Sequence, residues 1–227
     1  ITAIRKLFPE IDIFVINDAS TDNTQEESLR NGARVLPHIS NLGYGATLET
    51  GYLYAVQQNY DILLQMDGDG QHIAEELSKI LQPILLDKAD IVIGSRYAEN
   101  GLPIIRIPFL RRIGHRLFAW IIKLSCGINI KDPTSGFQAM NRKAFQFLTE
   151  NGFPCDYPDS DVIIMALKSG LRVVEVAVEM RERSGGESMH SGFKPLYYAV
   201  KMLLSIFIVL LNSPQWRSIR NRRKGKT

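Results

Sequence analysis

Short apolar runs alternate with helical patterns along the first half of this 227-residue chain. That alternation is typical of an α/β protein, in which helices connect the parallel strands of one sheet. The sequence therefore predicts strands at residues 12–16, 34–36, 62–66 and 90–94, with helices at 24–31, 46–59 and 74–86 between them. Pro83 is expected to kink the last of these helices.

The second half of the chain is less regular. We expect a basic amphipathic segment at 109–124, a strand at 136–140, a helix at 159–169 and a strand at 172–178. Neither an internal repeat nor a linker is visible. We therefore expect one domain, residues 1–212, with a nucleotide-sugar-binding half at 1–96, an acceptor-binding half at 97–193, a C-terminal helix at 194–212 and a basic tail at 213–227.

Positive charge is concentrated in two regions, although the net charge is only +3. Residues 213–227 carry six Lys or Arg and no acid, and residues 100–131 carry another six without one Asp or Glu. Such regions suit an anionic membrane surface or phosphate-bearing ligands. The alternative is a solvated helix face and a disordered tail.

Two further features bear on location. The longest apolar stretch, residues 196–211, is interrupted by Lys201 and is shorter than the roughly 20 residues that a spanning helix needs. The two cysteines are too few for a disulfide framework. We expect a cytoplasmic protein, peripheral on the cytoplasmic face of the membrane, with a possible membrane protein partner and no nucleic-acid partner.

The sharpest motif is Asp67-Gly-Asp-Gly-Gln-His72, which follows the third apolar run. Ligands in open α/β sheets bind at the carboxyl ends of the strands, so this motif should share a crevice with the polar residues after the first and fourth runs. Two carboxylates two residues apart, between glycines, provide hard oxygen ligands for Mg²⁺ or Mn²⁺. The alternative is a turn that is merely rich in Asp and Gly.

The string DGDGQH resembles the DADxQH segment of dolichyl-phosphate mannose synthases and their relatives in glycosyltransferase family 2. VINDASTDNT, NLGYGATLETG, GSRY, DPTSGFQAMNRKAF and RERSGGESM resemble five further family segments in the same order, so the match covers residues 12–189. The resemblance implies a GT-A-type three-layer α/β/α sandwich with a mostly parallel Rossmann-like sheet. It also implies that the first strand of the fold is missing from the chain.

The resemblance implies roles for the donor side of the site. Asp69 and Gln71 would ligate the divalent metal, and Asp67 would contact the metal's outer shell or the donor's ribose. Arg96 would grip the donor phosphates. Two further donor-binding residues are Asn17 and Asp18, near the nucleobase and ribose. The family usually has Asp where this chain has Asn17, so guanine and uracil both remain open as the donor base.

Three residues are expected to take part in catalysis. Asp69 would stabilise the departing charge through the metal. Arg183 would fold over the diphosphate when the site closes, where a guanidinium suits developing negative charge; the alternative is a surface arginine on a mobile loop. Asp161 would act as the general base if the acceptor is a hydroxyl. It would otherwise cap its helix, and Asp159 competes with it for either role.

On the acceptor side, Arg111 and His115 match the positions of an Arg and a Ser, four apart on a helix, that meet the acceptor phosphate in lipid-phosphate transferases. His115 departs from the family's Ser, and Arg112 is a possible substitute. Ser135, in the segment that resembles DxxSGF, is a further candidate for acceptor binding. The basic helix has an alternative role, which is to lie against lipid head groups.

Two other residues are expected to have structural roles only. Asp132 is expected to shape an Asp-Pro turn, and Tyr44 is expected to be a core or rim aromatic.

These expectations combine into one function: transfer of a sugar, with inversion, from a GDP-mannose or UDP-glucose type donor to a polyprenyl phosphate. One alternative is transfer to a saccharide hydroxyl in the synthesis of cell-surface polysaccharide, and a remote one is a nucleotide-sugar-binding protein without catalysis. A Rossmann dehydrogenase is disfavoured, because Leu48 stands where the third glycine of its motif should be.

Overall fold

The computed structural model describes residues 1–97, 109–150, 153–154, 158–181, 194–212, 215–216 and 219. Its elements are, in order, α1 (Thr2–Leu7), β1 (Phe14–Asn17), α2 (Thr24–Arg30), β2 (Arg34–Pro37), α3 (Tyr44–Gln57), β3 (Ile62–Gln65), the 3₁₀ helix η1 (Ala74–Glu76), α4 (Leu77–Leu85), β4 (Ile91–Ser95), α5 (Phe109–Cys126), β5 (Gln138–Asn141), α6 (Arg142–Glu150), α7 (Ser160–Lys168), β6 (Val173–Ala177) and α8 (Lys194–Leu211).

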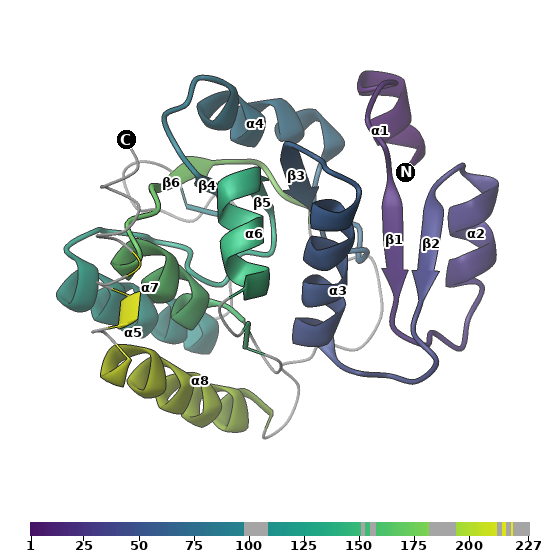
Figure 1. The fold of residues 1–227 in the computed structure, drawn as a ribbon. Helices are drawn as coiled ribbons and strands as arrows, with labels where there is room; N and C mark the ends of the chain where they lie inside the picture. Colours follow the sequence, from purple (N-terminus) through teal and green to yellow (C-terminus); the bar gives the residue numbers. More distant parts are fainter. Residues whose placement is uncertain are drawn as a thin grey trace.

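The strands form a parallel pair, β1 and β2, and a four-stranded sheet in the order β3-β5-β4-β6 (Figure 1). β5 runs antiparallel to both of its neighbours, whereas β4 and β6 are parallel. Because β3 and β4 both oppose β5, they run in the same direction and their carboxyl ends lie at one edge. The predicted alternation is confirmed, and the insertion of an antiparallel strand between β3 and β4 is the main departure from it.

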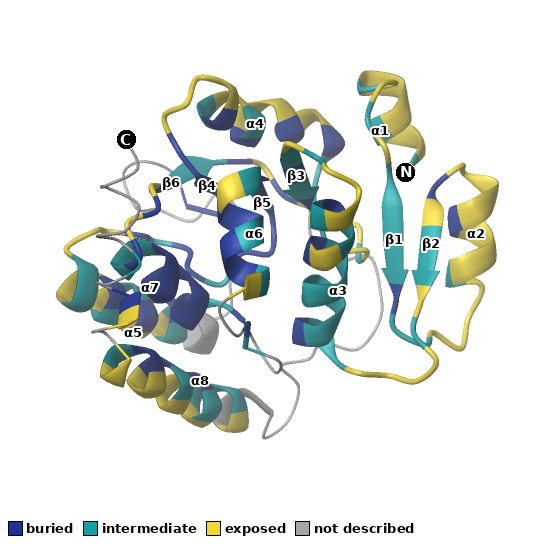
Figure 2. Ribbon diagram, viewed as in Figure 1, coloured by how far each residue is buried: buried dark blue, intermediate teal, exposed yellow. Residues whose placement is uncertain are grey.

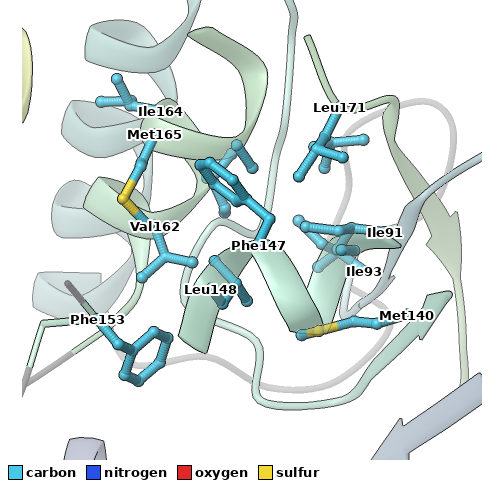
Figure 3. Packing of buried hydrophobic residues seen from close by; sticks show 14 of the residues in the cluster. Ile91, Ile93, Met140, Phe147, Leu148, Phe153, Val162, Ile164, Met165 and Leu171 are labelled. Carbon is cyan, nitrogen blue, oxygen red and sulfur yellow. The ribbon is translucent and has the colours of Figure 1, made fainter. Parts of the chain in front are cut away.

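The four-stranded sheet is buried on both faces. Ile91 and Ile93 of β4 pack into one apolar cluster with helices α6 and α7, shown in Figure 3. Val92, which points to the opposite face, packs with Leu77 and Ile80 of α4 in a second cluster. A strand that is covered on both faces has a continuous apolar sequence, as Ile91 to Ile93 have in β4. The result is the expected three layers, helix on sheet on helix.

Helices α5, α7 and α8 form a group at the far side of the sheet from β1 and β2 (Figure 1), with α7 in contact with both α5 and α8. α6 packs against α3 and was not among the elements expected from the sequence. None of the helices in the described part of the chain has the length and apolar character needed to cross a membrane.

Candidate active site

The acidic turn begins where β3 ends and is closed by its own polar groups. The backbone amide of Asp67 donates to Nδ1 of His72 at 3.0 Å, and the amide of Gln71 donates to Oδ1 of Asp69 at 3.1 Å. Gly70 has a φ of +77°, a conformation that glycine adopts without strain. Burial lowers the pKa of His72, whose ring stacks on Phe137 at 4.8 Å, so this histidine is neutral near pH 7. The turn thus presents both carboxylates from one tight loop.

Three of the sequence motifs meet at Asp67. The hydroxyl of Tyr44, the first residue of α3 after the glycine-rich loop, donates to Oδ1 of Asp67 at 3.3 Å. A Cβ on Gly136 would lie 2.7 Å from Oδ2 of Asp67 and 2.9 Å from the hydroxyl of Tyr44, so a larger residue there would displace these two side chains. Tyr44 was expected to be a core or rim aromatic; its contact with the acidic turn was not visible in the sequence.

Asp18 organises the loop before α3. Its carboxylate accepts hydrogen bonds from the amides of Leu42 at 2.8 Å and Gly43 at 2.9 Å, and Nδ1 of His38 lies 2.7 Å from it. Partial burial raises the pKa of Asp18, but these hydrogen bonds outweigh burial and leave the pKa below its ordinary value. Asn17 is buried and accepts from the amide of Ser20 at 3.0 Å. Asn17 therefore holds the turn at the end of β1 and Asp18 holds the loop before α3, and the contacts of both residues with the donor stay predictions.

Arg96 points into the protein. Its Nε and Nη2 each lie 2.6 Å from the carboxylate of Asp132, and Nη2 also donates to Oγ1 of Thr134 at 3.1 Å. Arg96 is 6% exposed and Asp132 is fully buried. Burial raises the pKa of Asp132, but the charge and hydrogen bonds of Arg96 bring it below its ordinary value. These groups of Arg96 are engaged by the protein, and a grip on donor phosphates stays a prediction.

His115 and Arg112 reach the same region from α5. The buried ring of His115 has Nδ1 2.9 Å from the hydroxyl of Tyr97 and Nε2 3.1 Å from Oγ1 of Thr134. Within the described residues, Nε of Arg112 is buried without a hydrogen-bond partner. Burial and the charge of Asp132 raise the pKa of Tyr97, while the charges of Arg96, Arg112 and Arg116 lower it. The N-terminal part of α5 therefore contributes a buried imidazole and a buried guanidinium nitrogen.

The other two acceptor candidates are Ser135 and Arg111, and only the side chain of Ser135 lies within the described part of the chain. Ser135 is buried, donates to the carbonyl of Gly94 at 2.6 Å and accepts from the amide of Phe137 at 3.3 Å, so its hydroxyl braces the β4–β5 junction. Arg111 belongs to α5, but its side chain lies outside the described part of the chain, as does the whole of Arg183.

The two acids before α7 have different surroundings. Asp161 is buried, accepts from the amides of Asp159 at 3.0 Å and Val162 at 2.8 Å, and is held by the hydroxyl of Ser205 from α8. Asp159 instead lines a narrow pocket with Tyr44 and Gly136, next to the acidic turn. Burial is the main cause that raises the pKa of Asp159 to about 7; the charges of Asp161 and Asp67 act in the same direction, and a hydrogen bond from Tyr198 opposes the rise. Of the two acids, Asp159 therefore shares a pocket with two residues that contact Asp67, and Asp161 does not.

Gln71 is hydrogen-bonded to Arg181, in the segment that follows β6. The amide of Arg181 donates to the Gln71 carbonyl at 2.8 Å, and Nε2 of Gln71 donates to the Arg181 carbonyl at 3.4 Å. Among the described residues, no three His, Cys, Asp or Glu side chains gather closely enough to hold a metal by themselves. Two carboxylates and an amide oxygen still fit Mg²⁺ or Mn²⁺, because such ions keep waters and substrate phosphates as their other ligands.

Comparison with known proteins agrees with this architecture. The family model described as "Glycosyl transferase family 2" matches residues 1–149. The chain is 29% identical over 201 residues to the undecaprenyl-phosphate mannosyltransferase of Micrococcus luteus, covering 83% of this chain and 79% of that one. It is 30% identical over 195 residues to the polyprenol monophosphomannose synthase of Mycolicibacterium smegmatis, covering 81% and 72%.

A solved structure shows the same fold at low sequence identity. Glucosyl-3-phosphoglycerate synthase from Mycobacterium tuberculosis, in complex with Mn²⁺, UDP-glucose and phosphoglyceric acid, has a TM-score of 0.67 at 16% identity, covering 92% of this chain and 74% of that one. The likeness confirms the predicted GT-A-type α/β fold. Because the family model matches more than half of the residues of this chain, the chain belongs to glycosyl transferase family 2.

Proposed function

We propose that this protein transfers a sugar from a nucleoside-diphosphate sugar to a polyprenyl phosphate, at the cytoplasmic surface of a membrane. The observation that carries the acceptor assignment is Arg112, whose buried Nε has no hydrogen-bond partner within the described residues. A buried guanidinium nitrogen without a partner is unfavourable unless a ligand accepts its hydrogen bond. A phosphate oxygen is well suited to accept it, because it is negatively charged. The names of the two bacterial relatives above support the same acceptor.

On the donor side, we assign Asp67, Asp69 and Gln71 to a divalent cation. That cation neutralises the charge on the departing nucleoside diphosphate. Asn17 and Asp18 support the loop nearest the nucleoside, and Arg96 and Arg183 are proposed to contact the donor phosphates. The Mn²⁺ and UDP-glucose bound by the structural relative support both a metal and a uridine donor, while the mannosyltransferase names support GDP-mannose.

The proposed reaction is one in-line displacement. An oxygen of the acceptor phosphate forms the new bond to the anomeric carbon as the bond to the nucleoside diphosphate breaks, and the electron pair leaves with the diphosphate. The acceptor oxygen is already ionised near neutral pH, so it needs no general base. Arg111, Arg112 and His115 would hold the phosphate in line for attack, which is the main requirement of such a step.

Asp159 favours a second candidate function, transfer to a saccharide hydroxyl. A hydroxyl must lose a proton as it attacks, and an efficient general base has a pKa near the working pH. Asp159 has a pKa raised to about 7, lines the pocket beside the acidic turn and accepts a hydrogen bond from Tyr198. Asp161 accepts from two backbone amides and from Ser205 of α8, and it does not line that pocket. In this alternative we assign the base to Asp159 in place of Asp161.

The test is transfer of radiolabelled sugar from GDP-mannose and, separately, UDP-glucose, with polyprenyl phosphate in detergent and Mg²⁺ or Mn²⁺. The proposal predicts label in the organic phase with one of the two donors. Label that stays aqueous in every reaction, while a saccharide acceptor becomes labelled, would contradict the lipid-phosphate assignment and support the second function.

We expect the double change Arg111→Ala and Arg112→Ala to lower transfer to polyprenyl phosphate by about a hundredfold, the scale for losing charged contacts to a reacting phosphate. Hydrolysis of the donor by water, which needs no acceptor, should fall by less than about threefold. Lys123→Ala, a change to an exposed cation on the same helix, is the matched control. An equal loss in both assays would place these arginines on the donor side.

Replacing Asp159 with Asn should stabilise the fold at alkaline pH. The folded pKa of about 7 lies above the ordinary value of 3.8, so between these values the folded state keeps a proton that the unfolded state releases. Stability therefore falls as pH rises from about 4 to 7, and Asn removes that loss. Thermal unfolding should show Asp159→Asn more stable than the original by at least about 1 kcal/mol at pH 8 and nearly equal at pH 4. The exposed Asp61→Asn is the control, and a pH-independent difference would contradict the raised pKa.

A further inference from the structure

The outer sides of α5 and α8 expose large apolar side chains in regular stripes. On α8 these include Val200, Leu204, Phe207 and Leu211, each more than half exposed, and on α5 they include Leu117 and Trp120, which is 60% exposed. Spacings of three and four residues place each set on one helix face. Figure 2 shows exposed positions along α8 on the side turned away from the rest of the protein. We call these two stripes together the α5/α8 face.

The two stripes belong to helices that both pack on α7 and touch each other at one pair of rings. The rings of Phe118 on α5 and Tyr198 on α8 meet edge to face at 6.1 Å, and the inner residues of both helices share one core cluster. Met202 and Ile206, on the inner side of α8, are 1% and 3% exposed. Each helix therefore has one apolar side in the core and a second apolar side in solvent. An exposed patch of this kind marks an interaction site.

The charges around the α5/α8 face have one sign. Arg116 and Lys123 occupy exposed positions of α5 and Lys201 lies on α8, and neither helix contains an Asp or Glu. A second copy of the chain would bring these cations together, and like charges oppose such an interface. A surface of anionic lipid would instead pair with them, while bulky apolar and aromatic side chains enter its head-group region. Charge complementarity thus favours a lipid surface.

The same helices build the acceptor side of the candidate site with their inner faces. The hydroxyl of Tyr198 donates to Asp159 at 2.5 Å, Ser205 donates to Asp161, and His115 contacts Thr134. A helix that lies on lipid through one side therefore holds site residues with its other side. A lipid surface in contact with the outer side of these helices would lie about one helix diameter from the site, on the order of 10 Å.

We propose that the α5/α8 face docks on the surface of an anionic lipid bilayer and holds the acceptor side of the site at the level of the head groups. The inference rests on the proposed function in one respect: a docking face beside the site is useful because the proposed acceptor is a lipid. The docking itself requires neither donor nor acceptor, and it is tested without them.

The experiment is co-sedimentation of the protein with vesicles of phosphatidylcholine and phosphatidylglycerol, against vesicles of phosphatidylcholine alone. We expect preferential binding to the anionic vesicles. The double change Leu204→Glu and Phe207→Glu should weaken that binding at least about tenfold, since two apolar side chains lose their burial. Leu29→Glu with Leu53→Glu, which adds the same charge at exposed leucines of α2 and α3, is the matched control and should bind like the original protein.

A second readout reports the site of contact. The chain has two tryptophans, and Trp216→Phe leaves Trp120 as the only one. Its fluorescence should shift to shorter wavelength on anionic vesicles, as expected when an exposed indole leaves water. Unchanged Trp120 emission during binding, an equal loss in the control pair, or a dimer in solution that Leu204→Glu with Phe207→Glu disrupts would each overturn the proposal. Transfer to polyprenyl phosphate in detergent, measured separately, tells whether the proposed function survives such a result.

Discussion

Replacing Asp69 with Ala is expected to lower the turnover of sugar transfer by about a hundred- to a thousandfold, the usual effect of removing one electrostatic stabiliser of a transition state. Asp69 lies in the turn after β3, and its Oδ1 accepts the amide of Gln71, so the carboxylate also fixes the loop that carries the other proposed metal ligands. The turnover with saturating donor, measured across a Mg²⁺ or Mn²⁺ titration, should stay low at every metal concentration.

Asp61→Ala is the control for this experiment, because Asp61 is an exposed acid that immediately precedes β3, at the opposite end from the acidic turn. It should leave turnover within about twofold. Thermal unfolding of Asp69→Ala should also be measured, since a loss of the loop's hydrogen bond costs only about 1 kcal/mol and does not unfold the domain. Retention of most activity by Asp69→Ala would exclude it as a metal ligand.

Local pattern was enough to predict most elements and the edge at which the motifs meet. β3 and β4 were expected at 62–66 and 90–94, and they lie at Ile62–Gln65 and Ile91–Ser95. The place of β5 between them could not be predicted, because its pairing joins segments far apart in the chain: Ile62 pairs with Asn141 and Ile91 with Met140. A strand's neighbours depend on the whole fold, whereas its existence depends on its own residues.

The directions and partners of side chains were the second feature that could not be predicted from the sequence. Asp159 and Asp161 stand two residues apart at the beginning of one helix, and composition gives no reason to prefer either. The choice depends on α8, whose Ser205 holds Asp161 while Tyr198 reaches Asp159. Arg96 is a similar case. Its partner Asp132 is 36 residues away in the chain, so the GSR motif suggested a free guanidinium where the fold provides a buried ion pair.

Replacing Asp132 with Ala should destabilise the fold by about 3–5 kcal/mol, because it leaves the guanidinium of Arg96 buried without its charge partner. Arg96 would lose both bonds of 2.6 Å and the bond from its own backbone amide at 2.9 Å. The measurement is the free energy of unfolding in urea. Glu27→Ala is the control, since Glu27 forms an exposed ion pair with Arg30 and should lose no more than about 1 kcal/mol.

A double variant separates the structural role of this pair from a role in substrate binding. Changing Arg96 to Met together with Asp132 to Leu removes both charges, and it should recover most of the stability that Asp132→Ala loses. A double variant as unstable as Asp132→Ala would contradict the buried-charge explanation. If the double variant folds and still transfers sugar, Arg96 serves the fold alone. If it folds and its transfer falls at least about a hundredfold, Arg96 also acts on a phosphate of the donor or acceptor, as the motif predicted.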